Sequence, residues 1–317
     1  RTRQARYLHP SRAPLSMPVG KNIAIGLLIL LLGLTLGSKS GEVLAALGRL
    51  AETNETLVVP LPHRLEVFGE SIDLKDRDLA ECLSRELHAN TYWHSNTLLM
   101  LQRRGAWEAE VRQWLREEGV PEDFVFLLAA ESGFQPTALS PSGAAGFWQF
   151  MPATGREWDL RVDAQIDERY HAEKATRAAA RYLKNAYAKT GSWFLAAAAY
   201  NMGLTGVLRQ MERQGERNYF RMTWNEETGR YAFRIAALKL LLEHPEHYGY
   251  HVRAEELWRE ESGRRMTLDS SVAHWGRWAQ REGVSYRELK RWNPWLRESF
   301  FDNPDSISVE LELPLKR

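Results

Sequence analysis

Apolar residues recur at three- and four-residue steps from Asp73 onward, the spacing of the buried face of successive amphipathic helices. The positions that show it are Leu74, Leu79, Leu83 and Leu87, then Leu98, Leu99 and Leu101, then Val111, Trp114 and Leu115. Gly105 and Gly119 are expected to separate these helices. Continuous alternating strand patterns are absent from the middle of the chain, so the sequence predicts a mainly α domain.

One segment of this region is apolar on every side. Residues 124–130, Phe-Val-Phe-Leu-Leu-Ala-Ala, therefore predict a buried central helix. Further helices are predicted over residues 172–189, 192–200 and 230–242. Together these segments define a helical domain over residues 73–261, preceded by a linker over residues 41–72.

The first forty residues have a different pattern. An uninterrupted apolar run, residues 23–36, follows several basic residues, and the first acidic residue is Glu42. Fourteen helical residues extend about 21 Å, short of a bilayer core of about 30 Å. We therefore interpret residues 1–40 as a basic cytoplasmic flank with either a cleaved signal or a retained inner-membrane anchor, two alternatives that the sequence leaves open. In both, the chain after Ser40 is exported to the periplasmic side of the cell envelope.

The pattern changes again after about Ser262. Short apolar stretches suggest a strand near Thr267, two helices over residues 272–291, and a closing strand over residues 307–314. The sequence thus predicts a small α+β module over residues 262–317 with the order strand, helix, helix, strand.

The composition argues against several classes of partner and site. The 42 basic and 41 acidic residues give a net charge of +1, so a nucleic-acid partner is not expected. The single cysteine, Cys82, excludes an intramolecular disulfide and a cysteine-built metal site. His244, His247 and His251 have near-helical spacing, but Pro245 interrupts it, and we expect no metal. No phosphate-binding glycine loop is present, and no cofactor is expected.

Candidate chemistry begins where the apolar helix ends. Glu131 directly follows residues 124–130, so its carboxyl group is expected to be partly desolvated, which raises its pKa towards that of a general acid. The alternative is a helix-end glutamate that faces water. Gly133 and Pro136 end the helix, and the small residues 140–146 form a loop that a ligand can approach closely.

Three motifs carry a resemblance to a known family. Glu131-Ser132-Gly133-Phe134, the stretch from Gly143 to Gly155 that contains Gly146-Phe147-Trp148-Gln149, and Ala199-Tyr200-Asn201-Met202-Gly203 resemble the three signatures of the family 1 lytic transglycosylases. The resemblance covers about residues 122–244, with Phe147 where leucine is usual. It implies a lysozyme-like fold and a substrate in the glycan strands of peptidoglycan.

The resemblance also implies a mechanism. Glu131 would be the only catalytic acid/base, protonating the glycosidic oxygen between N-acetylmuramic acid and N-acetylglucosamine. The muramoyl C6 hydroxyl would then attack C1 and close a 1,6-anhydro ring, without a second carboxylate or a cofactor. Two alternatives remain: a lysozyme-type hydrolase in which Glu131 delivers water, and a peptidoglycan-binding scaffold without activity.

Six further positions match the family's substrate-binding residues. Ser132 resembles the residue that orients the catalytic carboxyl. Gln149 and Asn201 resemble the amides that bind sugar and acetamido groups. Tyr200 and Tyr231 resemble cleft residues, although buried structural roles are the alternative. Glu227 resembles the acid of the last signature, with a salt bridge as its alternative.

The C-terminal module has a resemblance of its own. Gly283-Val284-Ser285, Leu289-Lys290 and Asn293-Pro294 resemble a LysM-like module, a class that binds glycans containing N-acetylglucosamine. The usual motif of the first strand is missing. The alternative is a structural tail packed on the catalytic domain.

Overall fold

The structure is a computed structural model that describes residues 58–259 and 263–315. The predicted basic flank and apolar segment of residues 1–40 lie outside these ranges, so signal and anchor both stay predictions. Among the helices of the described ranges, none combines the length and the apolar character that a membrane crossing needs.

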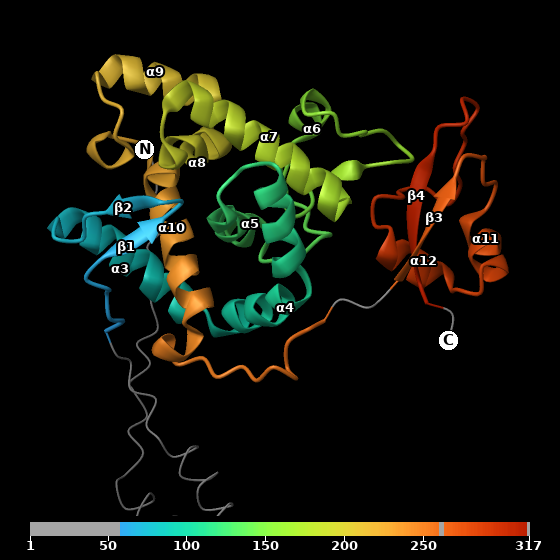
Figure 1. Cartoon of the computed structure of the whole chain (residues 1–317), viewed down its shortest axis with the longest axis horizontal. Coiled ribbons are helices and arrows are strands. Elements are labelled where there is room, and N and C mark those ends of the chain that lie inside the picture. Colours follow the sequence, from blue (N-terminus) through green and yellow to red (C-terminus); the bar gives the residue numbers. More distant parts are fainter. Residues whose placement is uncertain (1–57, 260–262, 316–317) are drawn as a thin grey trace, which may run out of the picture. The chain divides into compact units, whose positions relative to one another are not determined.

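The main domain is built from helices, as the sequence predicts (Figure 1). In chain order they are α3 (Arg77–Thr91), α4 (His94–Glu117), α5 (Val125–Ser132), α6 (Pro152–Glu157), α7 (Ala172–Thr190), α8 (Trp193–Met202), α9 (Leu204–Gln214) and α10 (Glu226–Glu243). Short 3-10 helices connect several of them: η2 (Glu122–Phe124), η3 (Glu168–Tyr170), η4 (Tyr219–Arg221) and η5 (Pro245–Tyr248).

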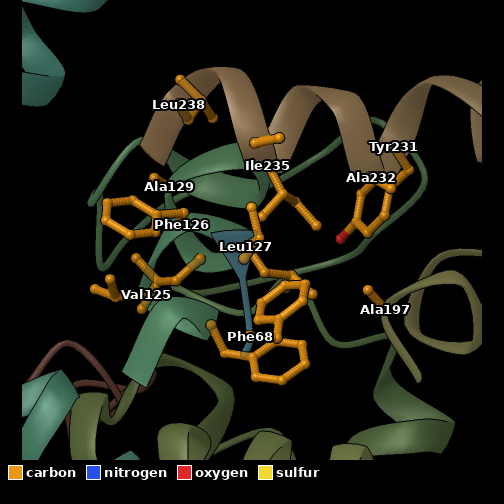
Figure 2. Close-up of a cluster of buried hydrophobic side chains, with 14 of the residues drawn as sticks. Phe68, Val125, Phe126, Leu127, Ala129, Ala197, Tyr231, Ala232, Ile235 and Leu238 are labelled. Atoms are coloured by element: carbon orange, nitrogen blue, oxygen red, sulfur yellow. The ribbon is translucent and has the colours of Figure 1, made fainter. Parts of the chain in front are cut away.

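Helix α5 is the buried centre of this domain. The side chains from Val125 to Leu128 are fully buried. In Figure 1 the helix lies between α4 and α10, and Figure 2 shows its apolar side chains facing those of α10. Gly133 ends the helix with a φ of +57°, a left-handed conformation that glycine adopts without strain, and its N–H donates to Ala129 O. Glu131 therefore lies in the last turn, at the edge of the core.

Helix α4 differs from the sequence expectation. It runs unbroken through Gly105, which we expected to separate two helices. The reason for a small residue there lies in the packing: a Cβ atom at position 105 would lie 2.7 Å from Leu257 Cβ and 2.7 Å from Trp258 O. The chain after α10 thus crosses α4 closely at this point, and Trp258 N–H donates to Gln102 O at 3.0 Å.

A small hairpin precedes the helices. Strands β1 (Leu65–Val67) and β2 (Glu70–Ile72) pair antiparallel, with Phe68 and Gly69 in the turn. Phe68 stacks on Phe124 at a centroid distance of 4.1 Å, and its N–H donates to the Asp123 carboxylate at 2.8 Å. Part of the predicted linker is therefore packed against the start of α5.

The C-terminal module has the predicted order of elements. Strands β3 (Gly263–Leu268) and β4 (Val309–Pro314) pair antiparallel, with Gly263 opposite Pro314 and Leu268 opposite Val309. Helices α11 (Trp275–Arg281) and α12 (Tyr286–Trp292) lie between them in the chain. The buried Asn293 joins α12 to β4, because its amide donates to Glu312 O at 2.6 Å and accepts from Glu312 N–H at 2.9 Å.

The module packs on the segment that precedes α7. Asp167 N–H donates to Trp295 O at 2.9 Å and Arg297 N–H donates to Gln165 O at 2.8 Å, and Ile166 forms a β-bridge with Leu296. Ile166 and Tyr170 are buried in the same apolar cluster as the module's own core residues. The module is therefore joined to the helical domain by backbone pairing and by a shared apolar core.

Candidate active site

A cleft of about 620 Å³ opens beside the end of α5. Residues of α3, α4, α10 and the loop after α5 form its walls. Three of the predicted site residues, Glu131, Ser132 and Gln149, line it. Motifs 18 residues apart in the sequence thus meet at one concave surface, as the position of polar groups at helix ends predicts.

The Glu131 carboxyl group has a neutral hydrogen-bond donor. The Tyr231 hydroxyl donates to Glu131 Oε1 from α10. Burial raises the pKa of Glu131 because it disfavours the carboxylate, and the charge of Glu227 adds to this effect, whereas the Tyr231 hydrogen bond and the charge of Arg234 act against it. The pKa of Tyr231 is also raised by burial, so the phenol keeps its proton. Glu131 is therefore suited to donate a proton and, once ionised, to be stabilised by Tyr231.

Tyr200 has a supporting position. Its hydroxyl donates to Trp148 O at 2.7 Å, and its ring contacts those of Trp148 and Phe150. Burial raises its pKa well above the ordinary tyrosine value. Tyr200 thus fixes the backbone next to Gln149, and it is not among the residues that line the cleft.

Asn201 and Glu227 are brought together, although 26 residues separate them. The Asn201 amide donates to Glu227 Oε1 at 3.0 Å and accepts from the Thr228 hydroxyl at 2.8 Å. These bonds join the end of α8 to the start of α10. Neither residue lines the cleft, so their predicted contact with substrate stays a prediction.

Gln149 holds the loop that carries it. Its backbone φ is +48°, and its amide nitrogen donates to Gly146 O at 2.8 Å and to Ala138 O at 3.3 Å. Within the described ranges no protein donor contacts its amide oxygen. The oxygen is therefore available to accept a hydrogen bond, and the predicted contact of Gln149 with substrate stays a prediction.

Ser132 donates its hydroxyl hydrogen to Leu128 O, one turn earlier in α5, at 3.2 Å. The hydrogen bond to the Glu131 carboxyl comes instead from Tyr231. Ser132 lines the cleft, and its role in orienting the carboxyl stays a prediction.

The loop over residues 140–150 is braced from beneath. Arg169 donates to both Asp167 carboxylate oxygens at 2.9 and 2.7 Å, and its Nη1 donates to Gly143 O at 2.8 Å and to Phe150 O at 2.9 Å. Gly146 lies so close to this brace that a Cβ atom would be 1.8 Å from Arg169 O. Asp167 and Arg169 therefore hold this loop in place.

Sequence reasoning missed a charged group in the cleft wall. Glu86 of α3 is buried, with an exposed fraction of 1%, and lines the cleft with Arg230 and Arg234. Its carboxylate accepts from Arg230 Nε at 2.6 Å and lies 3.6 Å from Arg234 Nε. The sequence feature that could have identified Glu86 is its position between Leu83 and Leu87, where a charged residue falls on the apolar face of α3.

One group of possible metal ligands occurs among the described residues. His244, Glu246 and His247 have ligand atoms within 4.8 Å of one another, and all three are exposed. They lie on η5 and its N-terminal flank, and none of them lines the cleft. Exposed groups of this kind are common without an ion, and the expectation that no metal is used stays a prediction.

Two family models match the chain. Residues 110–223 match the transglycosylase SLT domain, and residues 264–317 match the soluble lytic transglycosylase C-terminal LysM-like domain. Residues 110–223 are thus similar to an SLT transglycosylase domain. This match contains Glu131 and the cleft loop, whereas Glu227 and Tyr231 lie beyond its end.

Curated relatives agree with these matches. The chain is 28% identical over 226 residues to membrane-bound lytic murein transglycosylase D of Escherichia coli K12, which is 70% of this chain and 48% of that protein. It is 42% identical over 88 residues to peptidoglycan transglycosylase gp16 of Escherichia phage T7, which is 27% of this chain and 7% of that protein. The chain thus spans about half the length of the first of these relatives.

Proposed function

We propose that this protein is a lytic transglycosylase that cleaves the β-1,4 bond between N-acetylmuramic acid and N-acetylglucosamine in peptidoglycan and leaves 1,6-anhydro ends. The observation that carries the proposal is the environment of Glu131, a carboxyl group whose pKa is raised by burial and which receives a hydrogen bond from Tyr231 in an open cleft. The SLT match and the names of the relatives support peptidoglycan as the substrate class.

The roles of the carboxylates favour a single acid/base. Among the described residues that line the cleft, the carboxylates are Glu86 and Glu131. Glu86 is buried and paired with Arg230, so it is not available as a nucleophile or as a base that activates water. A two-carboxylate glycosidase requires such a second group.

The proposed reaction is balanced without water. Glu131 gives its proton to the glycosidic oxygen, the C1–O bond breaks, and the substrate's own N-acetyl oxygen stabilises the positive charge at C1. The C6 hydroxyl of the same muramoyl residue then bonds to C1, and its proton returns to the Glu131 carboxylate. Tyr231 would stabilise this carboxylate between the two proton transfers.

The wider setting is part of the proposal. We expect the enzyme to act in cell-wall remodelling on the periplasmic side of the cell envelope, held at the inner membrane or secreted through the apolar segment of residues 23–36. Its partner would be the peptidoglycan glycan strand, with no cofactor and no nucleic acid. Residues 1–40, 41–72, 73–261 and 262–317 would form the targeting segment, the linker, the catalytic domain and the LysM-like module.

Mass spectrometry of digested sacculi tests the reaction. The proposal predicts muropeptides lighter by one water than those of a lysozyme, whereas products of ordinary hydrolytic mass would favour the lysozyme-type alternative.

Glu131→Gln should abolish turnover and keep glycan binding, because the amide has the shape of the carboxyl but cannot donate a titratable proton. The matched control is Glu81→Gln on the exposed side of α3, which should leave turnover unchanged. Binding without cleavage by the unmodified protein would favour the scaffold alternative.

A further inference from the structure

A second pocket, of about 740 Å³, lies where α4 faces the C-terminal module. We call it the distal pocket. Its walls come from α4, from the start of α7, from the segment around Trp258, and from β3, α12 and β4 of the module. It is thus built from both parts of the chain that the family models match separately.

The distal pocket is rich in indole rings. Five tryptophans line it: Trp107, Trp114, Trp258, Trp292 and Trp295. Trp258 is exposed over 48% of its surface, whereas Trp295 is buried. Exposed indole faces suit the apolar C–H face of a pyranose ring, and the indole N–H adds a polar group at the edge.

Charge favours a neutral ligand. The pocket is lined by three glutamates, Glu110, Glu173 and Glu312, and by three arginines, Arg259, Arg265 and Arg291. Arg265 is paired with Glu312 at 3.3 Å, so these charges partly neutralise one another. A surface for an acidic peptide or an anionic lipid would carry an excess of basic groups. Carboxylate and guanidinium groups beside aromatic faces can instead accept from and donate to the hydroxyl and amide groups of an uncharged glycan.

The distal pocket adjoins the catalytic cleft along one face of α4. Met100 and Arg103 line the cleft, and Trp107 and Glu110, spaced by three and four residues, line the distal pocket. The Arg103 guanidinium lies 5.9 Å from the centre of the Trp258 ring, so a cleft residue contacts a pocket residue. From Met100 to Trp114 this face of α4 extends about 21 Å at a rise of 1.5 Å per residue.

We propose that the distal pocket binds a further stretch of the same glycan strand whose scissile bond lies at Glu131, so that the strand follows α4 from the cleft onto the module. This inference rests on the proposed function for the identity of the strand. A long strand would engage both sites, and a short oligosaccharide would fill the cleft alone. The pocket therefore determines preference for long strands and leaves the chemistry at Glu131 unchanged.

The test measures binding apart from catalysis. In the full chain with Glu131→Gln, Trp258→Ala should weaken binding to long glycan strands by roughly fivefold to tenfold, the cost of about 1 to 1.4 kcal/mol for a lost aromatic contact. Binding to a tetrasaccharide should not change. The strands and the tetrasaccharide both keep their stem peptides, so that the lactyl carboxyl groups stay amides and the sugar backbone is uncharged. Trp258→Phe keeps an aromatic face and should retain most of the long-strand affinity. Because Trp258 is half exposed, these variants should fold, and the melting temperature checks this.

The matched control is Tyr187→Ala, a ring with 38% of its surface exposed that lines neither pocket. It should bind both substrates as the parent does. Equal long-strand binding by Trp258→Ala and its parent would overturn the inference. So would an equal loss on the tetrasaccharide, which would place the effect in the cleft through Arg103. Long-strand binding that depends on Trp258, in a protein whose unmodified form cleaves nothing, would reject the proposed function and keep the distal pocket only as a glycan-binding site.

Discussion

The two glutamates of the cleft, Glu131 and Glu86, have identical side chains but differ in the groups that surround them. Glu131 faces a phenol that donates a hydrogen bond without adding charge. Glu86 faces the guanidinium groups of Arg230 and Arg234, which neutralise it and fix α3 against α10. Burial beside a neutral donor raises the pKa of Glu131, as the proposed acid requires, whereas burial beside cations produces a structural ion pair at Glu86.

The Tyr231 hydroxyl offers a test at the residue scale. Tyr231→Phe removes the hydrogen bond that lowers the pKa of Glu131, so that pKa should rise further. The carboxylate formed in the first proton transfer also loses its donor. A hydrogen bond to a charged group contributes about 1.5 to 3 kcal/mol, so kcat should fall roughly 10-fold to 100-fold. Steady-state turnover of sacculi measures this. Tyr250→Phe, which removes a buried hydroxyl bonded to Thr91 O, is the control, and an equal loss in it would contradict the assignment.

The pH profile of the unmodified protein follows from the same group. A general acid must carry its proton in the free enzyme, and the pKa of Glu131 is raised by burial. The kcat/KM value should therefore hold at pH values where an ordinary glutamate is ionised, and should fall as pH rises through the raised pKa. Initial rates across the acidic to alkaline range, with the melting temperature followed in parallel, measure it. A flat profile above neutrality would contradict the role of Glu131.

At the scale of elements, segments with a clear periodic pattern were predictable and the shortest strands were not. The pattern over residues 172–189 predicts α7, which spans Ala172–Thr190, within one residue. The hairpin β1–β2 escaped prediction, because strands of three residues are too short to show an alternating pattern. Gly105 was wrongly predicted to be a helix boundary. Its lack of a side chain instead lets a segment about 150 residues later in the sequence pack against α4.

The same limit applies to the site. The surroundings of Glu131 left two alternatives open, a desolvated carboxyl group and a helix-end glutamate that faces water, and the neighbouring motifs favoured the first. The Glu131–Tyr231 hydrogen bond joins residues 100 positions apart, and the Glu86–Arg230 pair joins residues 144 apart. No local pattern encodes such contacts. The family resemblance supplied Tyr231, and Glu86 had no such source.

Gly105→Ala gives a test of the crossing at α4. Alanine is favoured over glycine within a helix by about 0.8 to 1 kcal/mol. Against this gain, the new Cβ atom would lie 2.7 Å from Trp258 O and Leu257 Cβ, too close for either to stay in place. The clash should prevail, so the melting temperature should fall and Trp258 should change its fluorescence. The control is Gly276→Ala in α11, where the new Cβ atom meets nothing within 4 Å and should stabilise. A more stable Gly105→Ala protein would contradict the packing.

For the molecule as a whole, the attachment of the C-terminal module predicts a shared stability. Deleting residues 263–317 would expose Ile166 and Tyr170, which are now almost completely buried against the module. The melting temperature of the helical domain should therefore fall, as measured by calorimetry. An unchanged melting temperature would show that the contact adds no stability. Because a truncation removes packing and glycan contacts together, point variants such as Trp258→Ala are needed to separate the two.

His171 makes the junction sensitive to acid. Its ring stacks on Trp295, and its Nδ1 accepts from Lys174 N–H at 3.4 Å, which requires a neutral nitrogen. Burial, reinforced by the charges of Lys174 and Arg265 against that of Glu173, lowers the pKa of His171 from 6.5 to about 4. The unfolded chain binds the proton first, so stability should decline as pH falls from about 6.5 to about 4.

Melting temperatures across this pH range measure the effect. His171→Asn keeps a side chain that can cap α7 and removes the titration. The difference between the two proteins should be constant above pH 7 and should change as pH falls below 6.5. Parallel curves over the whole range would show that His171 does not titrate as described.

The backbone pairing of Gln165 and Asp167 with Trp295 and Arg297 has a consequence for protein engineering. A domain boundary drawn at Gly263 divides two family matches, but it separates the module from the segment on which it is docked. A chimera that joins residues 263–317 to a different lysozyme-like domain would lack the backbone of Gln165 and Asp167 with which the module pairs. It would also lack the apolar surface around Ile166 on which the module packs. A working chimera would therefore need both the module and the stretch from Arg161 to Tyr170, two segments that are far apart in the sequence.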